Sequence, residues 1–218
     1  MAGRLIVFEG TDGSGKSTQF ALARQALEAA GRDFRTFVYP QYQEESSALL
    51  RMYLSGQFGT HPSDVNAYAA STFFAVDRYA GYKRFWGAYY ELGGLMVLDR
   101  YTTSNAVHQS SKLTPPEREK FLRWLADFEY GILGLPAPDL VLWLDMPTSL
   151  AVANLRHREQ ETHTTGDIHE VDEAYLTACR QAAAQAADFF GWQRVPCTDG
   201  EGALRTPEDI HREILSYI

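Results

Sequence analysis

A glycine-rich stretch near the start of the chain constrains its fold more than any other feature. Residues 9–18 are Glu-Gly-Thr-Asp-Gly-Ser-Gly-Lys-Ser-Thr and contain the phosphate-loop pattern G-x-x-x-x-G-K-[ST]. The apolar run at residues 5–8 predicts a buried strand before it, and the amphipathic residues 20–30 predict a helix after it. Phosphate binding needs this strand–loop–helix context, so the stretch predicts a nucleoside triphosphate site. The fixed positions of the pattern are Gly10, Gly15, Lys16 and Ser17.

The expected chemistry of this loop follows from its residue types. Glycines let the backbone turn its N–H groups toward phosphate oxygens, and the positive end of the following helix adds to their effect. The Lys16 ammonium is expected to reach the β- and γ-phosphates, and the Ser17 hydroxyl to bind Mg²⁺. We expect the triphosphate to contact Gly10, Thr11, Asp12, Gly13, Ser14, Gly15, Lys16, Ser17 and Thr18.

Composition limits the class of protein and its partners. The chain has 218 residues, of which 45% are hydrophobic, and this predicts one α/β domain over residues 1–218. A net charge of −8 argues against nucleic acid or an anionic membrane as the main partner. Cys179 and Cys197 have neither metal-binding nor redox spacing, and the N-terminus carries no signal peptide. These features predict a cytoplasmic protein with reduced thiols.

Short apolar segments alternate with helical patterns along the chain. This alternation predicts a five-stranded parallel sheet with helices on both faces. Ligands of such sheets bind beyond the carboxyl ends of the strands, where the glycine-rich loop, Asp99 and Asp145 fall. The predicted strands are residues 5–8, 36–39, 95–98, 140–144 and 193–195. The predicted helices are residues 47–54, 62–92, 148–158 and 172–190, with two more that begin at Thr114 and Thr206.

A polar segment separates two of these helices. Residues 159–168 show no apolar periodicity, and this predicts a mobile loop. Transfer of a phosphoryl group requires water to be excluded from the site, so a segment that closes over it is needed. We therefore expect a lid at about residues 156–169.

Further motifs lie at the predicted sheet edge and on the long helical region. They are Phe8 to Thr18, Tyr39-Pro40, Phe74-Ala75-Val76-Asp77-Arg78, Asp99-Arg100-Tyr101 with Ser104 and Gln109, residues 135–140, and Leu144-Asp145. In this order the motifs resemble those of thymidylate kinases, a family of P-loop nucleoside monophosphate kinases. The resemblance covers most of the chain. It implies the five-stranded fold of that class, flanked by helices and closed by a mobile lid.

The resemblance also implies a role for individual residues. Asp12 resembles the carboxylate that accepts a hydrogen bond from the 3′-hydroxyl of deoxyribose, as an ionised carboxylate is able to do. Phe74 resembles the aromatic side chain that stacks on thymine, and Arg78 the arginine at the base edge. Asp99 matches the carboxylate of the magnesium shell, and Arg100 the guanidinium that binds the acceptor phosphate. The implied substrate-binding residues are Asp12, Tyr39, Phe74, Arg78, Arg100, Ser104, His108 and Gln109.

The sequence departs from the family pattern at three places. Gln41 and Tyr42 follow Tyr39-Pro40 where many members have an arginine, and Arg51 is the nearest substitute. His108 replaces an aromatic residue that helps to exclude ribose. Residues 13–15 contain no arginine, and family members of this kind carry catalytic arginines in the lid, a role that falls to Arg156 and Arg158. The implied catalytic residues are Asp12, Lys16, Arg100, Arg156 and Arg158.

The resemblance implies an ATP- and Mg²⁺-dependent kinase that converts dTMP to dTDP for dTTP synthesis and forms a homodimer. The main alternatives are a deoxynucleoside kinase and another pyrimidine monophosphate kinase. A deoxynucleoside kinase needs an acidic residue as general base soon after the second strand. This sequence has Pro40-Gln41 at that place, and the acidic residues Glu44-Glu45 follow only several residues later. A GTPase-type switch usually recognises guanine with an Asn-Lys-x-Asp segment, which this sequence does not contain. A non-catalytic nucleotide-binding module does not account for Asp99-Arg100.

Overall fold

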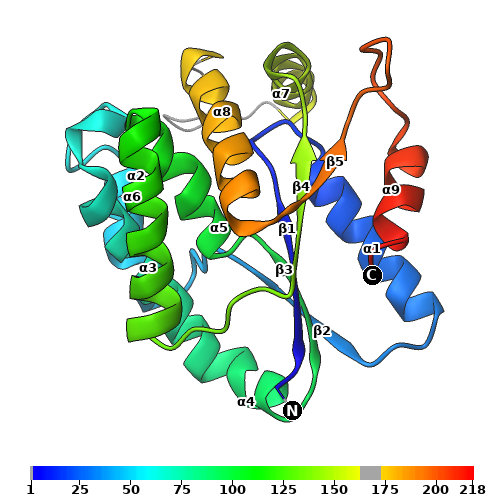
Figure 1. Cartoon of the computed structure of the whole chain (residues 1–218), viewed down its shortest axis with the longest axis horizontal. Helices are drawn as coiled ribbons and strands as arrows, with labels where there is room; N and C mark the ends of the chain where they lie inside the picture. The colour runs from blue at the N-terminus through cyan, green and yellow to red at the C-terminus, as the bar shows by residue number, and fades with distance from the viewer. Residues whose placement is uncertain (1, 163–172) are drawn as a thin grey trace.

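A parallel sheet forms the centre of the molecule (Figure 1). The computed structural model describes residues 2–162 and 173–218, with the backbone alone for residues 158–162. The sheet has the strand order β2-β3-β1-β4-β5, and every neighbouring pair is parallel. The predicted five-stranded parallel sheet is confirmed. Its strands are β1 (Arg4–Glu9), β2 (Phe34–Val38), β3 (Leu95–Asp99), β4 (Leu140–Asp145) and β5 (Gln193–Pro196).

Helices cover both faces of this sheet. In Figure 1 α1 and α9 lie on one side, and α3, α6 and α8 lie on the other. The α-helices are α1 (Lys16–Ala29), α2 (Ala48–Leu54), α3 (Ala67–Gly81), α4 (Gly87–Glu91), α5 (Thr102–Ser104), α6 (Pro115–Ala126), α7 (Thr148–Thr162), α8 (Glu173–Phe190) and α9 (Pro207–Leu215). Short 3₁₀ turns (Glu45–Ser47, Pro62–Asp64, Ser110–Lys112) and π segments (Tyr82–Trp86, Asn105–Gln109, Asp127–Ile132) link or extend them.

The core follows from the alternation of side chains along the strands. Ile6 and Phe8 of β1 point to the face covered by α1 and α9, where they pack with Leu27 and Ile214. The intervening residues of β1 point to the opposite face and pack against the aromatic residues that follow α3. Because both faces are buried, β1 is apolar at every position from residue 5 to 8.

Local capping signals in the sequence were accurate. Thr114 and Glu117 form the predicted capping box, with proline at the start of α6. Thr206 caps α9 by accepting a hydrogen bond from the Asp209 N–H group at 3.1 Å. Each of these signals acts within one helical turn, so it does not depend on the rest of the fold.

The long helical region predicted over residues 62–92 is confirmed, and it consists of several helical elements. Residues 62–64 form a single 3₁₀ turn, and α3 starts only at Ala67. The Asn66 side chain accepts a hydrogen bond from the Ala69 N–H group at 2.9 Å, which caps α3 there. A π segment then interrupts the helix before Gly87, where a Cβ atom would lie 2.7 Å from the Tyr82 carbonyl oxygen.

Two other segments differ from expectation. Residues 159–162 continue α7, whereas the sequence analysis placed them in a loop. Their glutamate and glutamine side chains favour helix although they form no apolar face. The rest of the expected lid, residues 163–169, lies outside the described residues. Residues 102–112, for which no element was predicted, form a run of short helical turns.

The register of the sheet brings the functional motifs to one edge. Phe8 of β1 lies opposite Asp99 of β3, so the loop after β1 and Arg100 leave the sheet side by side. In Figure 1 α7 lies beyond the same edge. The sheet therefore positions the glycine-rich loop beside Arg100 at this edge.

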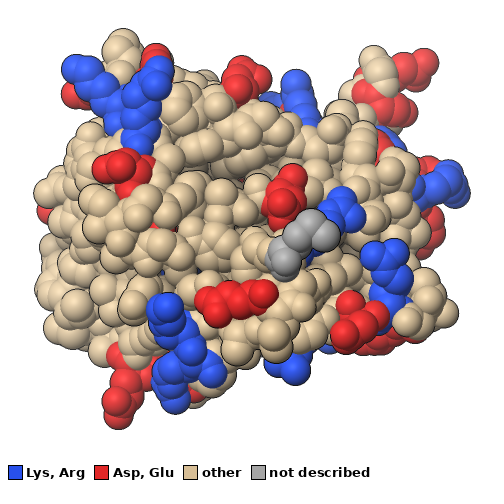
Figure 2. Space-filling view, turned by 60° about the horizontal axis from the view of Figure 1, so that its bottom comes forward, with Lys and Arg blue, Asp and Glu red and all other residues tan. Residues whose placement is uncertain are grey.

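The described surface is mixed in charge. On the face drawn in Figure 2, basic and acidic side chains lie interspersed and are separated by broad uncharged areas. Among the described residues, no helix combines the length and the apolar character that a membrane span requires.

A buried ion pair joins α3 to the π segment after α6. Arg78 donates to Glu129 through Nε and Nη2, both at 2.6 Å, and the two side chains are almost completely buried. Thr102 and Asn105 donate further hydrogen bonds to the same carboxylate, both at 3.2 Å. Glu129 is therefore the common acceptor for two segments that are far apart in the sequence, α3 and residues 102–105.

We expect Glu129→Gln to destabilise the fold by about 3–5 kcal/mol, because it leaves the buried Arg78 charge without a carboxylate. The measurement is the free energy of unfolding in urea. Glu119→Gln is the matched control, because Glu119 pairs with Arg123 on the exposed face of α6 and should cost about 0.5 kcal/mol or less. A loss of less than about 1 kcal/mol for Glu129→Gln would contradict this account.

Candidate active site

The loop between β1 and α1 has the backbone that its sequence pattern predicts. Gly13 and Gly15 have φ angles of 78° and 80°, in the left-handed region that favours glycine. A Cβ atom on Gly13 would lie 2.2 Å from the carbonyl oxygen of Ala151, so α7 packs directly on the loop. The Asn154 side chain of α7 also donates to the Gly13 carbonyl oxygen at 2.9 Å. The loop is therefore held between the sheet and α7.

This loop lines an open cleft, called here the phosphate cleft. Predicted contact residues 11–18 all line it, whereas Gly10 lies beneath Ser14, whose Oγ would be 2.5 Å from a Cβ on Gly10. The lining residues are Thr11, Asp12, Gly13, Ser14, Gly15, Lys16, Ser17, Thr18, Val38, Tyr39, Pro40, Tyr42, Asp99, Arg100, Asn154, Leu155 and His157.

Lys16 and Asp99 form an ion pair at the base of the phosphate cleft. Both side chains are more than nine-tenths buried. Burial lowers the pKa of Lys16, and the Arg100 charge lowers it further, although Asp99 and Glu9 oppose both effects. The structure thus brings together the predicted phosphate-binding lysine and the predicted carboxylate of the magnesium shell.

Arg100 is the centre of a second group of charges. Its Nη2 bonds to Asp12 Oδ1 at 2.5 Å, and its Nη1 lies 3.1 Å from His108 Nε2 and 3.9 Å from Glu9 Oε1. Burial lowers the pKa of Arg100, but the surrounding carboxylates raise it and prevail. Arg100 also has a φ angle of 66°, which is uncommon for a residue with a side chain and marks a constrained site.

Glu9 is a site residue that the sequence analysis did not single out. Its carboxylate is fully buried and accepts from the Gly10 N–H group at 2.9 Å. Its other oxygen accepts from the hydroxyls of Thr103 at 2.6 Å and Ser104 at 2.7 Å. Glu9 therefore ties the phosphate loop to α5 and faces Arg100. A glutamate at the end of an apolar strand, directly before the loop, was the available signal.

A second cleft opens beside the phosphate cleft. The predicted substrate-binding residues, although distant in sequence, all line it. They are Asp12, Tyr39, Phe74, Arg78, Arg100, Ser104, His108 and Gln109. The remaining lining residues were not predicted as site residues: Pro40, Tyr42, Leu54, Asp77, Tyr101, Asn105 and Tyr175.

Buried residues outside the second cleft orient some of its polar side chains. Glu129 fixes the plane of the Arg78 guanidinium by accepting from Nε and Nη2, and Nη1 donates to the Tyr101 carbonyl oxygen at 3.4 Å. The Glu129 charge raises the pKa of Arg78 and overcomes the effect of burial. Gln109 Oε1 is buried and has no hydrogen-bond partner among the described residues. An acceptor of this kind is costly unless a ligand or water satisfies it.

Hydrogen bonds with side chains of α2 and α3 stabilise the loop after β2. Asp77 accepts from the Gln41 N–H group at 2.8 Å and from the Ser46 hydroxyl at 2.6 Å. Arg51, considered as a substitute for the missing arginine, donates to the carbonyl oxygens of Tyr42 and Glu44 at 2.8 and 2.9 Å. Arg51 therefore stabilises this loop and lines neither cleft.

The two predicted lid arginines lie on α7. The Arg156 side chain is exposed and lines neither of the two clefts, although Asn154, Leu155 and His157 line the phosphate cleft. The Arg158 side chain lies outside the described part of the structure. The structure therefore places the backbone of both residues near the phosphate loop and leaves their roles as predictions.

Comparisons with known proteins agree on one family. The sequence model of the thymidylate kinase family matches residues 8–195. Thymidylate kinase of Mycobacterium tuberculosis is 35% identical over 163 residues, covering 72% of each chain, and a probable thymidylate kinase of Pyrococcus abyssi is 26% identical, covering 100% and 97%. The fold is similar to a solved thymidylate kinase of Candida albicans, with a TM-score of 0.70 at 18% identity, over 100% and 91% of the chains. The chain belongs to the thymidylate kinase family.

Proposed function

We propose that this protein transfers the γ-phosphoryl group of ATP to dTMP and forms dTDP. ATP is the phosphate donor of the family to which the chain belongs. One observation carries the proposal: the phosphate cleft and the second cleft meet, and Asp12, Tyr39, Pro40, Tyr42 and Arg100 line both. Two nucleotides bound in these clefts would face each other with their phosphates at Arg100. The proposal treats residues 1–218 as one kinase domain.

Catalysis by this arrangement is a matter of position and charge. The acceptor oxygen of a monophosphate is already anionic, so the reaction needs little help from a general base. The loop N–H groups and Lys16 hold the donor phosphates, and the Arg100 fork binds the acceptor phosphate on two oxygens. The carboxylates Asp99 and Asp12 pair with Lys16 and Arg100 in the structure and hold both cations in place beside the clefts.

The residues around the phosphate loop suit a magnesium ion. The Ser17 hydroxyl and the Asp99 carboxylate both line the phosphate cleft, and oxygen donors of this kind are those that Mg²⁺ prefers. Glu9, Asp12 and Asp99 also outnumber the cations Lys16 and Arg100, so an added cation improves the balance of charge. When bound, Mg²⁺ would neutralise charge on the donor phosphates.

The second cleft supports a deoxynucleotide as the acceptor. The Phe74 ring offers a surface for a base, and Arg78 and Gln109 offer one donor and one acceptor for its edge. Asp12 would accept a hydrogen bond from the sugar 3′-hydroxyl, and Tyr39 and Ser104 also line this cleft. A deoxynucleoside kinase would need a carboxylate here, but Glu44 lies outside both clefts and pairs with Arg84 at 2.6 Å.

The experiment is a coupled assay with ATP and Mg²⁺ across dTMP, dUMP, dCMP, dGMP and thymidine. We expect dTMP to have the highest kcat/KM, because Phe74, Arg78 and Gln109 would act on the base and Arg100 on the phosphate. Thymidine should be a poor acceptor, since it lacks the phosphate that Arg100 binds. If thymidine is the better substrate, the monophosphate kinase proposal is wrong.

We propose further that Arg158, rather than Arg156, supplies the catalytic lid charge. Ala151 and Leu155 of α7 face the loop glycine Gly13. In an α-helix position 158 returns to the face of position 151, whereas position 156 lies about 140° around the helix. The exposure of the Arg156 side chain agrees with this difference.

We expect Arg158→Ala to lower kcat by about 10³-fold or more, the contribution of an arginine finger, with near-normal ATP affinity. Arg158→Lys should fail to restore kcat, since an ammonium does not bridge two oxygens. Arg156→Ala on the same helix is the control and should retain kcat. If both alanine variants stay within about threefold of the original protein, the catalytic charge lies elsewhere.

We also propose a cytoplasmic homodimer with no nucleic-acid or membrane partner. Val76, Tyr79 and Phe85 are exposed by 40–53% on α3 and the π segment after it, and a second copy would cover them. Cys179 and Cys197 are buried free thiols, as expected in a reducing compartment. Light scattering after size-exclusion chromatography should give the mass of two chains; the mass of a single chain would contradict the dimer.

A further inference from the structure

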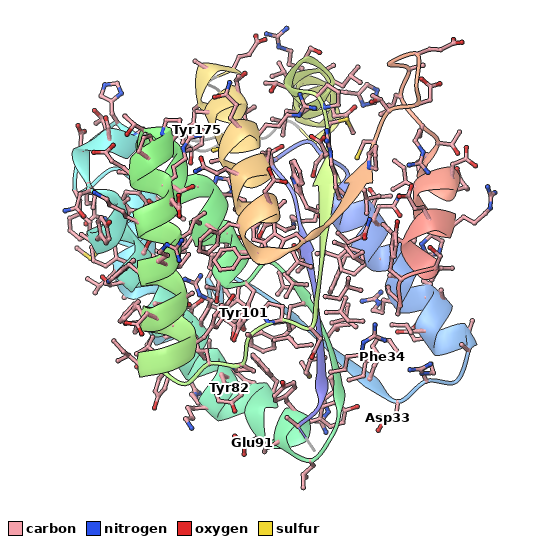
Figure 3. The ribbon with its side chains drawn as sticks, in the orientation of Figure 1. Asp33, Phe34, Tyr82, Glu91, Tyr101 and Tyr175 are labelled. Atoms are coloured by element: carbon pink, nitrogen blue, oxygen red, sulfur yellow. The ribbon has the colours of Figure 1, made fainter. Side chains whose placement is uncertain are left out.

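His108 connects the acceptor arginine to α8. Its Nε2 lies 3.1 Å from Arg100 Nη1, and its Nδ1 lies 3.2 Å from the Tyr175 hydroxyl. The two rings are stacked with their centroids 6.2 Å apart. Figure 3 shows Tyr175 at the start of α8, on the side of the sheet that carries α3 and α6. The imidazole thus has the arginine at Nε2 and groups of α8 at Nδ1.

The chemistry of these contacts selects one form of the imidazole. A guanidinium has five N–H donors and no acceptor, so the hydrogen bond must run from Arg100 to a lone pair on His108 Nε2. The proton of a neutral imidazole must then be on Nδ1, from which it is donated to the Tyr175 hydroxyl. In a charged imidazole both nitrogens carry hydrogen, and the bond to Arg100 is lost.

The groups behind His108 favour the same arrangement. Burial raises the pKa of Tyr175 well above its ordinary value, so its hydroxyl stays neutral. Cys179 Sγ lies 3.6 Å from His108 Nδ1, and burial raises the pKa of this thiol to about 11. Neither group becomes an anion near neutral pH that would stabilise a charged imidazole.

Other charged groups surround the segment that carries His108. On the cleft side they are Arg100 and Asp12, with Asp77 and Arg78 on α3. Lys112 and Arg118, on the segments after His108, lie near Cys179, and Tyr53 of α2 lies near Tyr175. Of these, Asp12 is already bonded to Arg100, and Arg78 to Glu129.

We propose that His108 is a positioning residue that orients the Arg100 guanidinium toward the acceptor phosphate. Tyr175 holds the imidazole in its neutral Nδ1–H form, and in this form Nε2 accepts a hydrogen bond from Arg100. This inference rests on the proposed function, because it assumes that Arg100 binds that phosphate. Asp12 holds Nη2 and His108 holds Nη1, so together they fix the plane of the fork. Protonation of His108 would remove one of these two supports and place a second positive charge beside Arg100.

The test compares His108→Gln with His108→Phe in the full-length protein. The readouts are dTMP affinity, by calorimetry without ATP, and KM and kcat. A glutamine oxygen can accept from Arg100 but does not titrate, so His108→Gln should stay within about threefold of the original affinity at pH 8. His108→Phe offers no acceptor and should weaken dTMP binding about tenfold or more, while ATP affinity is unchanged.

The pH profile separates positioning from a structural role. Between about pH 8 and pH 5.5, which brackets the ordinary imidazole pKa, the original protein should lose affinity for dTMP more steeply than His108→Gln. Protonation of the dTMP phosphate affects both proteins equally and cancels in their ratio. A ratio that stays constant with pH, or a His108→Phe variant with unchanged affinity at pH 8, overturns the proposal.

A double-mutant cycle provides the second measurement, for the case in which His108→Phe does not fold. Tyr175→Phe should weaken dTMP binding in the original protein and have a clearly smaller effect in the His108→Gln background, where no tautomer needs to be fixed. Equal effects in both backgrounds would mean that Tyr175 acts on the ligand directly, and would overturn the proposal. If the original protein does not bind dTMP, the proposed function fails as well; normal binding with no coupling rejects the positioning role alone.

Discussion

Compensation of charge at the carboxyl edge of the sheet is the constraint on which the rest of this site depends. A loop that binds phosphate gathers cations and N–H groups at one place, and these groups need partners when they are buried. Lys16 is paired with Asp99, and Arg100 with Asp12 beside the buried Glu9. Because Asp12 and Lys16 belong to the loop and to the start of α1, whereas Asp99 and Arg100 lie at the end of β3, the ion pairs also hold the loop against the sheet.

The balance of charge in this site affects how a nucleotide would bind. The carboxylates that stabilise the site also repel phosphate, so a nucleotide gains most when it arrives with a cation. The same carboxylates keep Lys16 and Arg100 oriented, which lowers the entropy that these side chains would lose on binding phosphate.

Partners far apart in the chain set the orientation of the second cleft. Glu129 orients Arg78 across 51 positions, and Tyr175 contacts His108 across 67 positions. The family resemblance assigned roles to Arg78 and His108, but it named neither partner. Glu129 showed no signal in the sequence, because an acidic residue near the end of a helix is ordinarily exposed to solvent. Its burial is explained only by the donors that converge on it from α3 and from residues 102–105.

The sequence by itself determined those features that depend on a few neighbouring residues. The phosphate loop, the buried strand β1 and the capping box at Thr114 were all predicted, because each depends on a short stretch of neighbouring residues. The helical turns of residues 102–112 were missed because their buried polar side chains form no apolar pattern. Tertiary structure alone decided them. Thr103 and Ser104 donate hydrogen bonds to the buried Glu9, and Asn105 donates one to the buried Glu129. A buried carboxylate is stable only where donors from distant segments meet it.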